Sequence, residues 1–124
     1  MVTPEPHHAY IISLEENLKK ALTELLILQL LSEREYYIGE MTATLKCRSG
    51  GRLAIVFPYG AIYRLEQSGY ILESKKRNAP DGRRRQYYTI TQKGTVYLHQ
   101  LLTIYASFSE GVAKVLEKES DTNE

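Results

Sequence analysis

Six basic side chains crowd the two ends of one turn sequence, and they are the clearest chemical signal in this 124-residue chain. Lys75-Lys76-Arg77 precedes the turn, and Arg83-Arg84-Arg85 follows it. Clustered Lys and Arg attract a polyanion such as the phosphate backbone of nucleic acid. Basic residues also protect the edges of a solvated hairpin, which is the alternative interpretation. Three consecutive arginines opposite three further cations favour the polyanion.

The distribution of charge supports this interpretation better than the total does. The whole chain carries a formal charge of only +1, whereas nucleic-acid binders usually show a clear basic excess. Residues 64–94, however, hold eight basic and three acidic residues, a net charge of +5. Residues 1–63 carry −1 and residues 95–124 carry −3, so the positive field is confined to one segment.

Patterns for catalysis or metal binding are weak. The chain has no glycine-rich phosphate loop, metal motif or nucleophile signature, so we expect neither enzyme activity nor a cofactor. Cys47 lies between two basic residues that could lower its pKa for a redox role, although an ordinary thiol is the simpler interpretation. His7-His8 and His99 could share a metal only if the fold happened to bring them together.

Composition also indicates the setting. A single cysteine allows no intramolecular disulfide. The longest apolar run, Leu25–Leu31, is interrupted by Gln29 and is too short to span a bilayer. The first residues lack the basic start and apolar stretch of a secretory signal. We therefore expect a cytoplasmic protein.

The N-terminal half predicts two helices. Residues 1–11 show no period and are expected to form a flexible arm, and Ser13 with Glu16 is a candidate capping box for a helix that extends to about residue 31. The segment Leu25–Leu31 is apolar nearly all round, so it must be covered on more than one side, and a second subunit could supply part of that cover. A second helix fits 38–46, and Leu53–Val56 is a short β-prone run.

A third helix and a hairpin complete the first 94 residues. Pro58 suits the first turn of this helix and Gly69 suits its end. Its spacing turns Ala61, Ile62 and Leu65 inward and leaves Tyr59, Tyr63 and Arg64 on the surface. Strand-like segments at 70–76 and 84–91 flank the basic turn.

The last helix has a heptad pattern, and Thr91 is its candidate cap. Its apolar residues follow alternating spacings of three and four, which indicates a dimerisation seam rather than a helix packed only on its own domain. The residues of this seam and its flank are Leu98, Leu101, Leu102, Tyr105, Phe108, Val112 and Val115.

Three helices followed by a hairpin predict a mainly α winged helix-turn-helix, at residues 12–94. A dimerisation helix follows at 95–118 and a disordered tail at 119–124. An exposed helix fits the major groove of duplex DNA and a basic hairpin reaches neighbouring phosphates. The candidate DNA contacts are Tyr59, Tyr63, Arg64, Lys75, Lys76, Arg77, Arg83, Arg84 and Arg85.

Two motifs in the chain resemble those of the PadR-like transcriptional regulators. The first, residues 59–71, is similar to the family's recognition-helix motif, Y-x-x-L-x-R-L-E-x-x-G-x-I. The second, residues 82–94, is similar to the wing motif, G-x-x-R-x-x-Y-x-[LI]-T-x-x-G. The leucine-rich segment Leu18–Leu31 is similar too, and the resemblance covers about residues 18–116.

The resemblance implies a homodimeric repressor of the short subtype, with one C-terminal helix for dimerisation. Tyr59 and Arg64 on the recognition helix and Arg85 in the wing would contact a pseudo-palindromic operator. Members of this family often respond to phenolic acids, drugs or other small hydrophobic molecules. An effector would therefore modulate operator binding.

The chain departs from the family pattern in places. Val56-Phe57-Pro58 stands where the family has Gly-Thr-Leu, Ile38 replaces a usual glycine, and tryptophan is absent. Tyr97, Tyr105 or Phe108 could replace the tryptophan that some members place against a drug, with a core role as the alternative. A winged-helix module that binds protein, without specific DNA readout, is the alternative function.

Overall fold

Helix α1 (Glu5–Glu33) runs through the centre of the computed structural model, which describes residues 5–54 and 58–117. The helix begins at Glu5 rather than near Ser13, so the predicted arm is wrong for residues 5–11, and Ser13 is no cap. Pro6 falls in the first turn, where a missing amide donor costs nothing, and no helix breaker separates it from Ser13. Residues 1–4 of the predicted arm lie outside the described ranges.

The hydrophobic core surrounds the second half of α1. The apolar run identified in the sequence packs against residues from every other helix and from the sheet, so the chain itself supplies the cover that a second subunit was expected to share. Helix α1 contacts α2 (Ile38–Arg48), α3 (Tyr59–Gln67) and α4 (Gln92–Leu116). The buried core consists of Leu25, Ile27, Leu28, Leu30, Leu31, Tyr36, Met41, Leu45, Ala61, Ile62, Leu65, Ile71, Tyr88 and Leu98.

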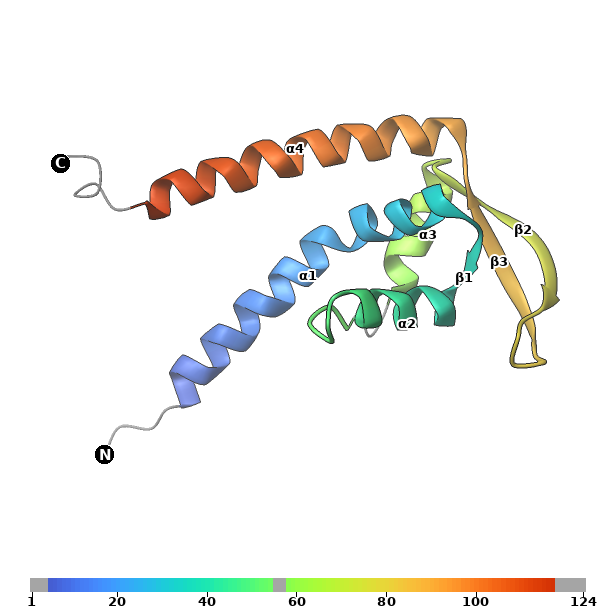
Figure 1. Cartoon of the computed structure of the whole chain (residues 1–124), viewed down its shortest axis with the longest axis horizontal. Helices are drawn as coiled ribbons and strands as arrows, with labels where there is room; N and C mark the ends of the chain where they lie inside the picture. Colours follow the sequence, from blue (N-terminus) through green and yellow to red (C-terminus); the bar gives the residue numbers. More distant parts are fainter. Residues whose placement is uncertain (1–4, 55–57, 118–124) are drawn as a thin grey trace.

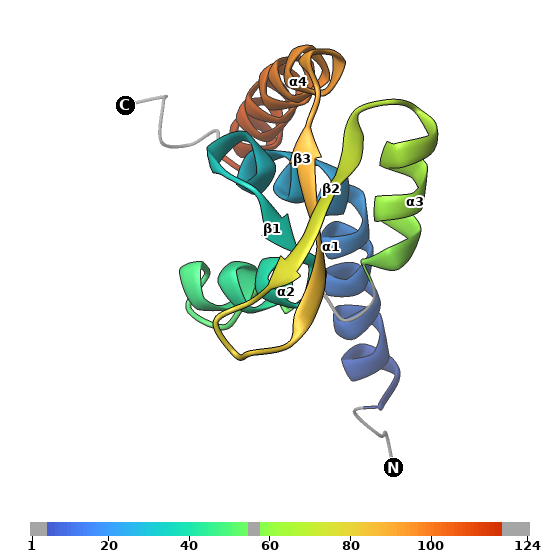
Figure 2. The same cartoon turned by 90° about the vertical axis from the view of Figure 1, so that its right-hand side faces the viewer.

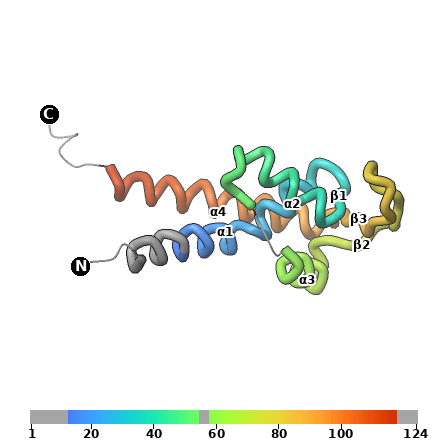
Figure 3. The backbone as a smooth tube through the Cα atoms, turned by 90° about the horizontal axis from the view of Figure 1, so that it is seen from below, coloured from blue at the N-terminus to red at the C-terminus, as the bar shows by residue number. Residues whose placement is uncertain are grey.

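Helices α2 and α3 flank α1 on opposite sides, as Figures 2 and 3 show. Helix α2 buries Met41 and Leu45 and ends before the predicted break at 49–51. Leu53 and Ala54, from the predicted β-prone run, are not in a strand, and the rest of that run, residues 55 and 56, lies outside the described residues. The helix–helix–helix order is thus as predicted.

The sheet has one strand more than the sequence indicated. Strand β1 (Tyr36–Tyr37) pairs with β3 (Arg84–Ile90), which pairs on its other side with β2 (Ile71–Asn78), all antiparallel. The predicted hairpin is therefore anchored to the end of α1 through β1. The fold is a winged helix, mainly α with a small sheet, as expected.

Helix α4 begins at the predicted cap, where the Thr91 hydroxyl accepts a hydrogen bond from the Gly94 amide at 3.0 Å. Gly94 is buried against Tyr70, and a Cβ on it would overlap the Tyr70 carbonyl oxygen. This close approach fixes the start of α4 beside the sheet. From there α1 and α4 diverge, as Figure 1 shows.

No helix in the described ranges is both long and apolar enough to cross a membrane.

Candidate nucleic-acid interface

The third helix is held by its two ends and presents an aromatic face. The Pro58 carbonyl accepts the first helical bond, from the Ile62 amide at 2.9 Å. At the other end, the Gly69 amide bonds Glu66 and the Tyr70 amide bonds Leu65, while Gly69 has φ 80°. This paired arrangement requires a residue that tolerates positive φ, so the sequence ends the helix at glycine.

Tyr59 and Tyr63 lie four residues apart on the outer face of α3, and 63% of each is exposed. The opposite face is buried against the core, as the spacing of Ala61, Ile62 and Leu65 predicted. Figure 2 shows α3 at the outer side of the molecule beside the hairpin. Two aromatic side chains with hydroxyl tips are thus available to a partner of this helix.

Arg64 is also exposed but already has an acidic partner. Its Nε donates to Oε2 of Glu24 on α1 at 2.8 Å, and its side chain remains 60% exposed. The predicted DNA contact therefore lies on the surface of the third helix, tied to the central helix. No local pattern in the sequence indicates this pair, because 40 residues separate its members.

The wing is a well-bonded hairpin. Its turn is closed by the Ala79 amide on the Arg83 carbonyl and by the Gly82 amide on the Ala79 carbonyl, both at 2.8 Å. The register shifts between Glu73 and Lys76, and the Gln86 side-chain amide donates to the Ser74 carbonyl at 2.6 Å. This bond satisfies a carbonyl at the bulge, so the basic end of the hairpin keeps a defined geometry.

Two of the six wing cations are neutralised. Arg77 and Arg85 are direct cross-strand partners, a repulsive placement for two like charges. Arg77 donates to Glu35 at 2.7 Å, and Arg85 donates to Asp81 at 2.8 Å. The Arg85 hydrogen bond also holds the pKa of Asp81 below its ordinary value.

The same two arginines lie against tyrosine rings. The Arg77 guanidinium is 3.7 Å from the centre of the Tyr87 ring, and that of Arg85 is 5.1 Å from the centre of the Tyr37 ring. The two rings meet edge to face at 5.4 Å. Cation–π contacts of this kind stabilise the wing internally, through Tyr87, and against β1, through Tyr37.

The other four wing cations, Lys75, Lys76, Arg83 and Arg84, are exposed. None forms an ion pair within the described part of the chain. They are the side chains that can reach an external polyanion without leaving an internal partner.

Tyr59 and Arg85 line the same surface hollow of about 250 Å³, between the start of α3 and the wing. Tyr37 and Gly39, at the start of α2, also line it. The structure therefore brings the start of α3 and the wing together. Tyr37 was not predicted as a residue of this surface. The adjacent pair Tyr36-Tyr37 is equally compatible with a loop and with a strand, so it did not indicate a position beside the wing.

The predicted dimerisation residues divide into two groups along α4. Leu98 is 3% exposed and belongs to the core of its own chain, so it is not available to a partner. Leu101 is half-buried against the same core. The others, Leu102, Tyr105, Phe108, Val112 and Val115, are exposed.

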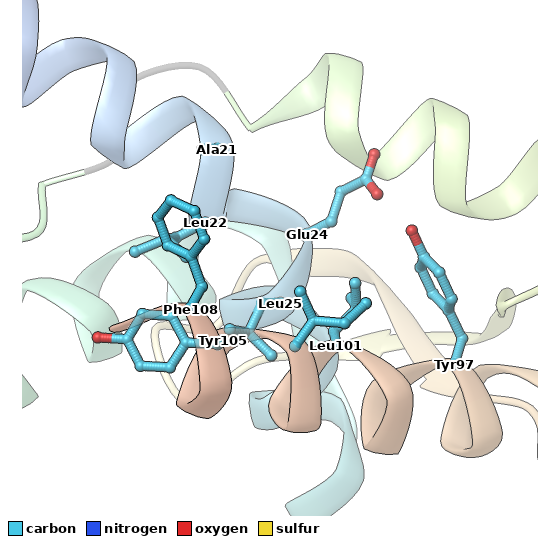
Figure 4. Close-up of a pocket in the computed structure, with 9 residues that line it drawn as sticks. Ala21, Leu22, Glu24, Leu25, Tyr97, Leu101, Tyr105 and Phe108 are labelled. Carbon is cyan, nitrogen blue, oxygen red and sulfur yellow. The ribbon is translucent and has the colours of Figure 1, made fainter. Parts of the chain in front are cut away.

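The three predicted effector residues line one pocket between α1 and α4. Its volume is about 250 Å³, and Tyr97, Tyr105 and Phe108 form one side of it. Ala21, Leu22, Glu24 and Leu25 from α1 form the other side (Figure 4). Tyr97 also stacks on Tyr70, just after α3, with ring centres 4.1 Å apart.

Cys47 is exposed near the end of α2. No group of three His, Cys, Asp or Glu side chains that could hold a metal occurs among the described residues.

Comparison with protein families decides the identity of this arrangement. The model of the transcriptional regulator PadR-like family matches residues 27–100, which is more than half of the chain. The chain belongs to the PadR-like family. It is a DNA-binding transcription regulator and not an enzyme, because this family and its structural neighbours are transcriptional regulators.

Solved structures of similar fold agree with this PadR-like assignment. A transcriptional regulator from Clostridium thermocellum is 25% identical with a TM-score of 0.71, covering 82% of this chain and 96% of the other. A PadR family regulator from Eggerthella lenta is 22% identical with a TM-score of 0.77, over 93% and 99% of the two chains. A PadR-like regulator from Bacillus cereus is 24% identical with a TM-score of 0.70, over 83% and 99%. The last two likenesses concern the fold. A comparison with curated proteins found no match.

Proposed function

We propose that the protein is a homodimeric repressor that binds a pseudo-palindromic operator and whose binding is modulated by a small hydrophobic or phenolic effector. The observation that carries this proposal is the shared hollow of Tyr59 and Arg85, which joins the exposed helix α3 to the basic wing. An exposed helix beside a basic hairpin can contact one face of duplex DNA, with the helix in the major groove and the wing on the phosphates.

In this proposal α3 reads sequence through Tyr59, Tyr63 and Arg64. The two tyrosines are already exposed, whereas Arg64 contacts DNA by leaving Glu24. Substitution of Tyr59 or Arg64 should therefore weaken operator binding more than binding to random duplex.

The wing contacts phosphates in this proposal, and its six cations have different roles. Lys75, Lys76, Arg83 and Arg84 are free to meet phosphate. Arg77 and Arg85 lie against the rings of Tyr87 and Tyr37, and reach DNA only as far as their acidic partners allow.

The outer part of α4 supports the dimer. Exposed apolar side chains run along it, including Phe108 at 72% and Val115 at 82% exposure. Leu14 and Leu18 on the facing part of α1 are exposed too. An apolar surface of this extent on a small protein is typical of a partner interface. In this proposal residues 12–94 bind DNA and the α4 surface beyond Leu101 binds the second copy.

The experiment is duplex binding as a function of salt. Replacing Lys76 and Arg84 with Ala should weaken binding to all sequences alike, and should reduce the slope of log K against log salt by about 2. The control is Lys114→Ala, which removes an exposed cation near the far end of α4.

An unchanged salt slope in the double variant would contradict the wing assignment. If the slope of log K against log salt is near zero for the wild-type protein, a protein-binding winged helix is favoured instead.

A further inference from the structure

The pocket between α1 and α4 contains a single carboxylate. Of the residues that line it, Glu24 alone carries a charge, and the rest are apolar or aromatic. Figure 4 shows the Glu24 carboxylate and the Tyr97 hydroxyl turned toward one another at one end, with Tyr105 and Phe108 at the other. The pocket thus has a polar end and an apolar end.

Glu24 keeps binding capacity toward the pocket. Its Oε2 accepts the Arg64 hydrogen bond at 2.8 Å, and its side chain is 26% exposed. The Tyr97 hydroxyl is a further hydrogen-bond partner of the same carboxylate, whose two oxygens have lone pairs left for a ligand donor. Burial and the nearby Glu24 carboxylate raise the pKa of the Tyr97 hydroxyl.

The charge of this end selects among ligands. Once Arg64 has left Glu24, a carboxylate held beside apolar side chains attracts a cation more strongly than it does in open water, and repels an anion. The volume of about 250 Å³ suits a compact body of about two rings. Aromatic faces on Tyr105 and Phe108 add contacts for such a body.

We propose that this pocket binds an amphiphilic organic cation, an aromatic or apolar body carrying a protonated amine, with Glu24 as the group that recognises the charge. This inference rests on the proposed effector site and narrows its chemistry, since it excludes ligands whose head is a carboxylate. It adds a specificity residue on α1 to the aromatic residues of α4.

The same carboxylate connects the pocket to the recognition helix. A cation at Glu24 competes with the Arg64 guanidinium for it, and DNA that takes Arg64 leaves Glu24 free for the cation. Ligand and DNA therefore favour each other's binding, and linkage requires the two effects to be equal.

The test uses three probes with the same ring system: 2-naphthylmethylamine, 2-naphthylmethanol and 2-naphthoate. Calorimetry on the full-length protein should show the amine binding at least tenfold more tightly than the alcohol, and the carboxylate most weakly. Glu24→Gln should reduce amine binding to the level of the alcohol while leaving alcohol binding within twofold. Glu16→Gln, on the exposed part of the same helix, is the matched control and should behave as the wild type.

Arg64→Ala tests the competition separately, because it releases Glu24 and should tighten amine binding severalfold. Saturating amine should also tighten duplex binding severalfold in the wild type and not in Glu24→Gln. Unchanged amine binding in Arg64→Ala, or unchanged or weaker duplex binding with amine, would overturn the competition.

Equal binding of the three probes, or an amine preference that survives in Glu24→Gln, would overturn the role of Glu24. Failure of every probe to bind the wild type would overturn the pocket as a ligand site. The salt-dependent duplex binding of the same sample reports on the DNA-binding function independently, so the two failures are distinguishable.

Discussion

The two halves of α4 carry one heptad pattern and put it to different uses. In the first half, Gly94 and Leu98 are buried, and Tyr97 stacks on Tyr70. In the second half, Phe108, Val112 and Val115 are as apolar as their counterparts but are exposed. The difference arises because α1 and α4 diverge away from the sheet (Figure 1), so α1 covers only the near half.

This contrast shows what an apolar repeat can and cannot tell. The repeat predicts which face of the helix is buried, but the packing of the rest of the chain decides what buries it. Near the sheet the cover is the chain's own core, and beyond Leu101 we propose that it is a second copy. Substitutions in the two halves should therefore fail in different ways.

The largest effect is expected at Gly94. A methyl group there would overlap the Tyr70 carbonyl oxygen and crowd Ile90, so Gly94→Ala should destabilise the fold by about 3 kcal/mol. Urea unfolding measures this change. The matched control is Gly111→Ala in the outer half, where no described side chain or other element lies within 4 Å of the added methyl group. That variant should be stabilised by up to about 1 kcal/mol, because alanine favours a helix. Equal effects at the two glycines would contradict the contrast.

A charge in the outer half should break assembly and leave the fold intact. Phe108→Asp places a carboxylate on the exposed face of α4, and we expect it to weaken the dimer by about 2 kcal/mol or more. Light scattering across a concentration series measures the shift toward monomer. The free energy of unfolding of the dilute, monomeric protein, measured in urea, should stay within about 0.5 kcal/mol of the wild-type value.

Lys114→Ala, further along the same helix, should leave the mass unchanged. A wild-type mass for Phe108→Asp would show that the outer half of α4 is not the interface.

Acid should slightly weaken the contact between α1 and α2. The Arg48 hydrogen bond to Glu33, which joins α2 to α1, lowers the pKa of Glu33 from 4.5 to about 2. A lowered folded-state pKa gives stability that is present above pH 4.5 and lost as the pH falls toward 2. Both side chains are partly exposed, so the contribution is at most about 1 kcal/mol.

The Glu33→Gln variant should be less stable than the wild type at pH 6 and nearly equal to it in stability at pH 2.5. A difference that persists at pH 2.5 would assign the effect to packing instead.

Local patterns predicted α2, α3, α4 and the hairpin well, because each has a signal within a few residues, whereas the capping-box pattern at Ser13 misplaced the start of α1. Thr91 indicates the start of α4, where its hydroxyl accepts a hydrogen bond from the Gly94 amide. Gly69 indicates the end of α3, where its φ is positive. Strand β1 could not be predicted in this way, since two residues show no period and Tyr36 joins the sheet only through its pairing with Tyr88.

The composition of the candidate site was predictable, but its internal pairing was not. The basic residues of the wing are plain in the sequence, whereas the ion pairs that divide them are tertiary contacts. Arg77 meets Glu35 across 42 residues, and Arg64 meets Glu24 across 40. Such pairs decide which cations remain free, and no local pattern encodes them.

Binding-site selection from random duplexes, with purified wild-type protein and Phe108→Asp in parallel, tests the central claim most directly. A homodimer that reads DNA through α3 should enrich an inverted repeat with half-sites about one helical turn apart. The Phe108→Asp protein should enrich single half-sites, more weakly. Absence of any inverted repeat from the wild-type selection would contradict the account.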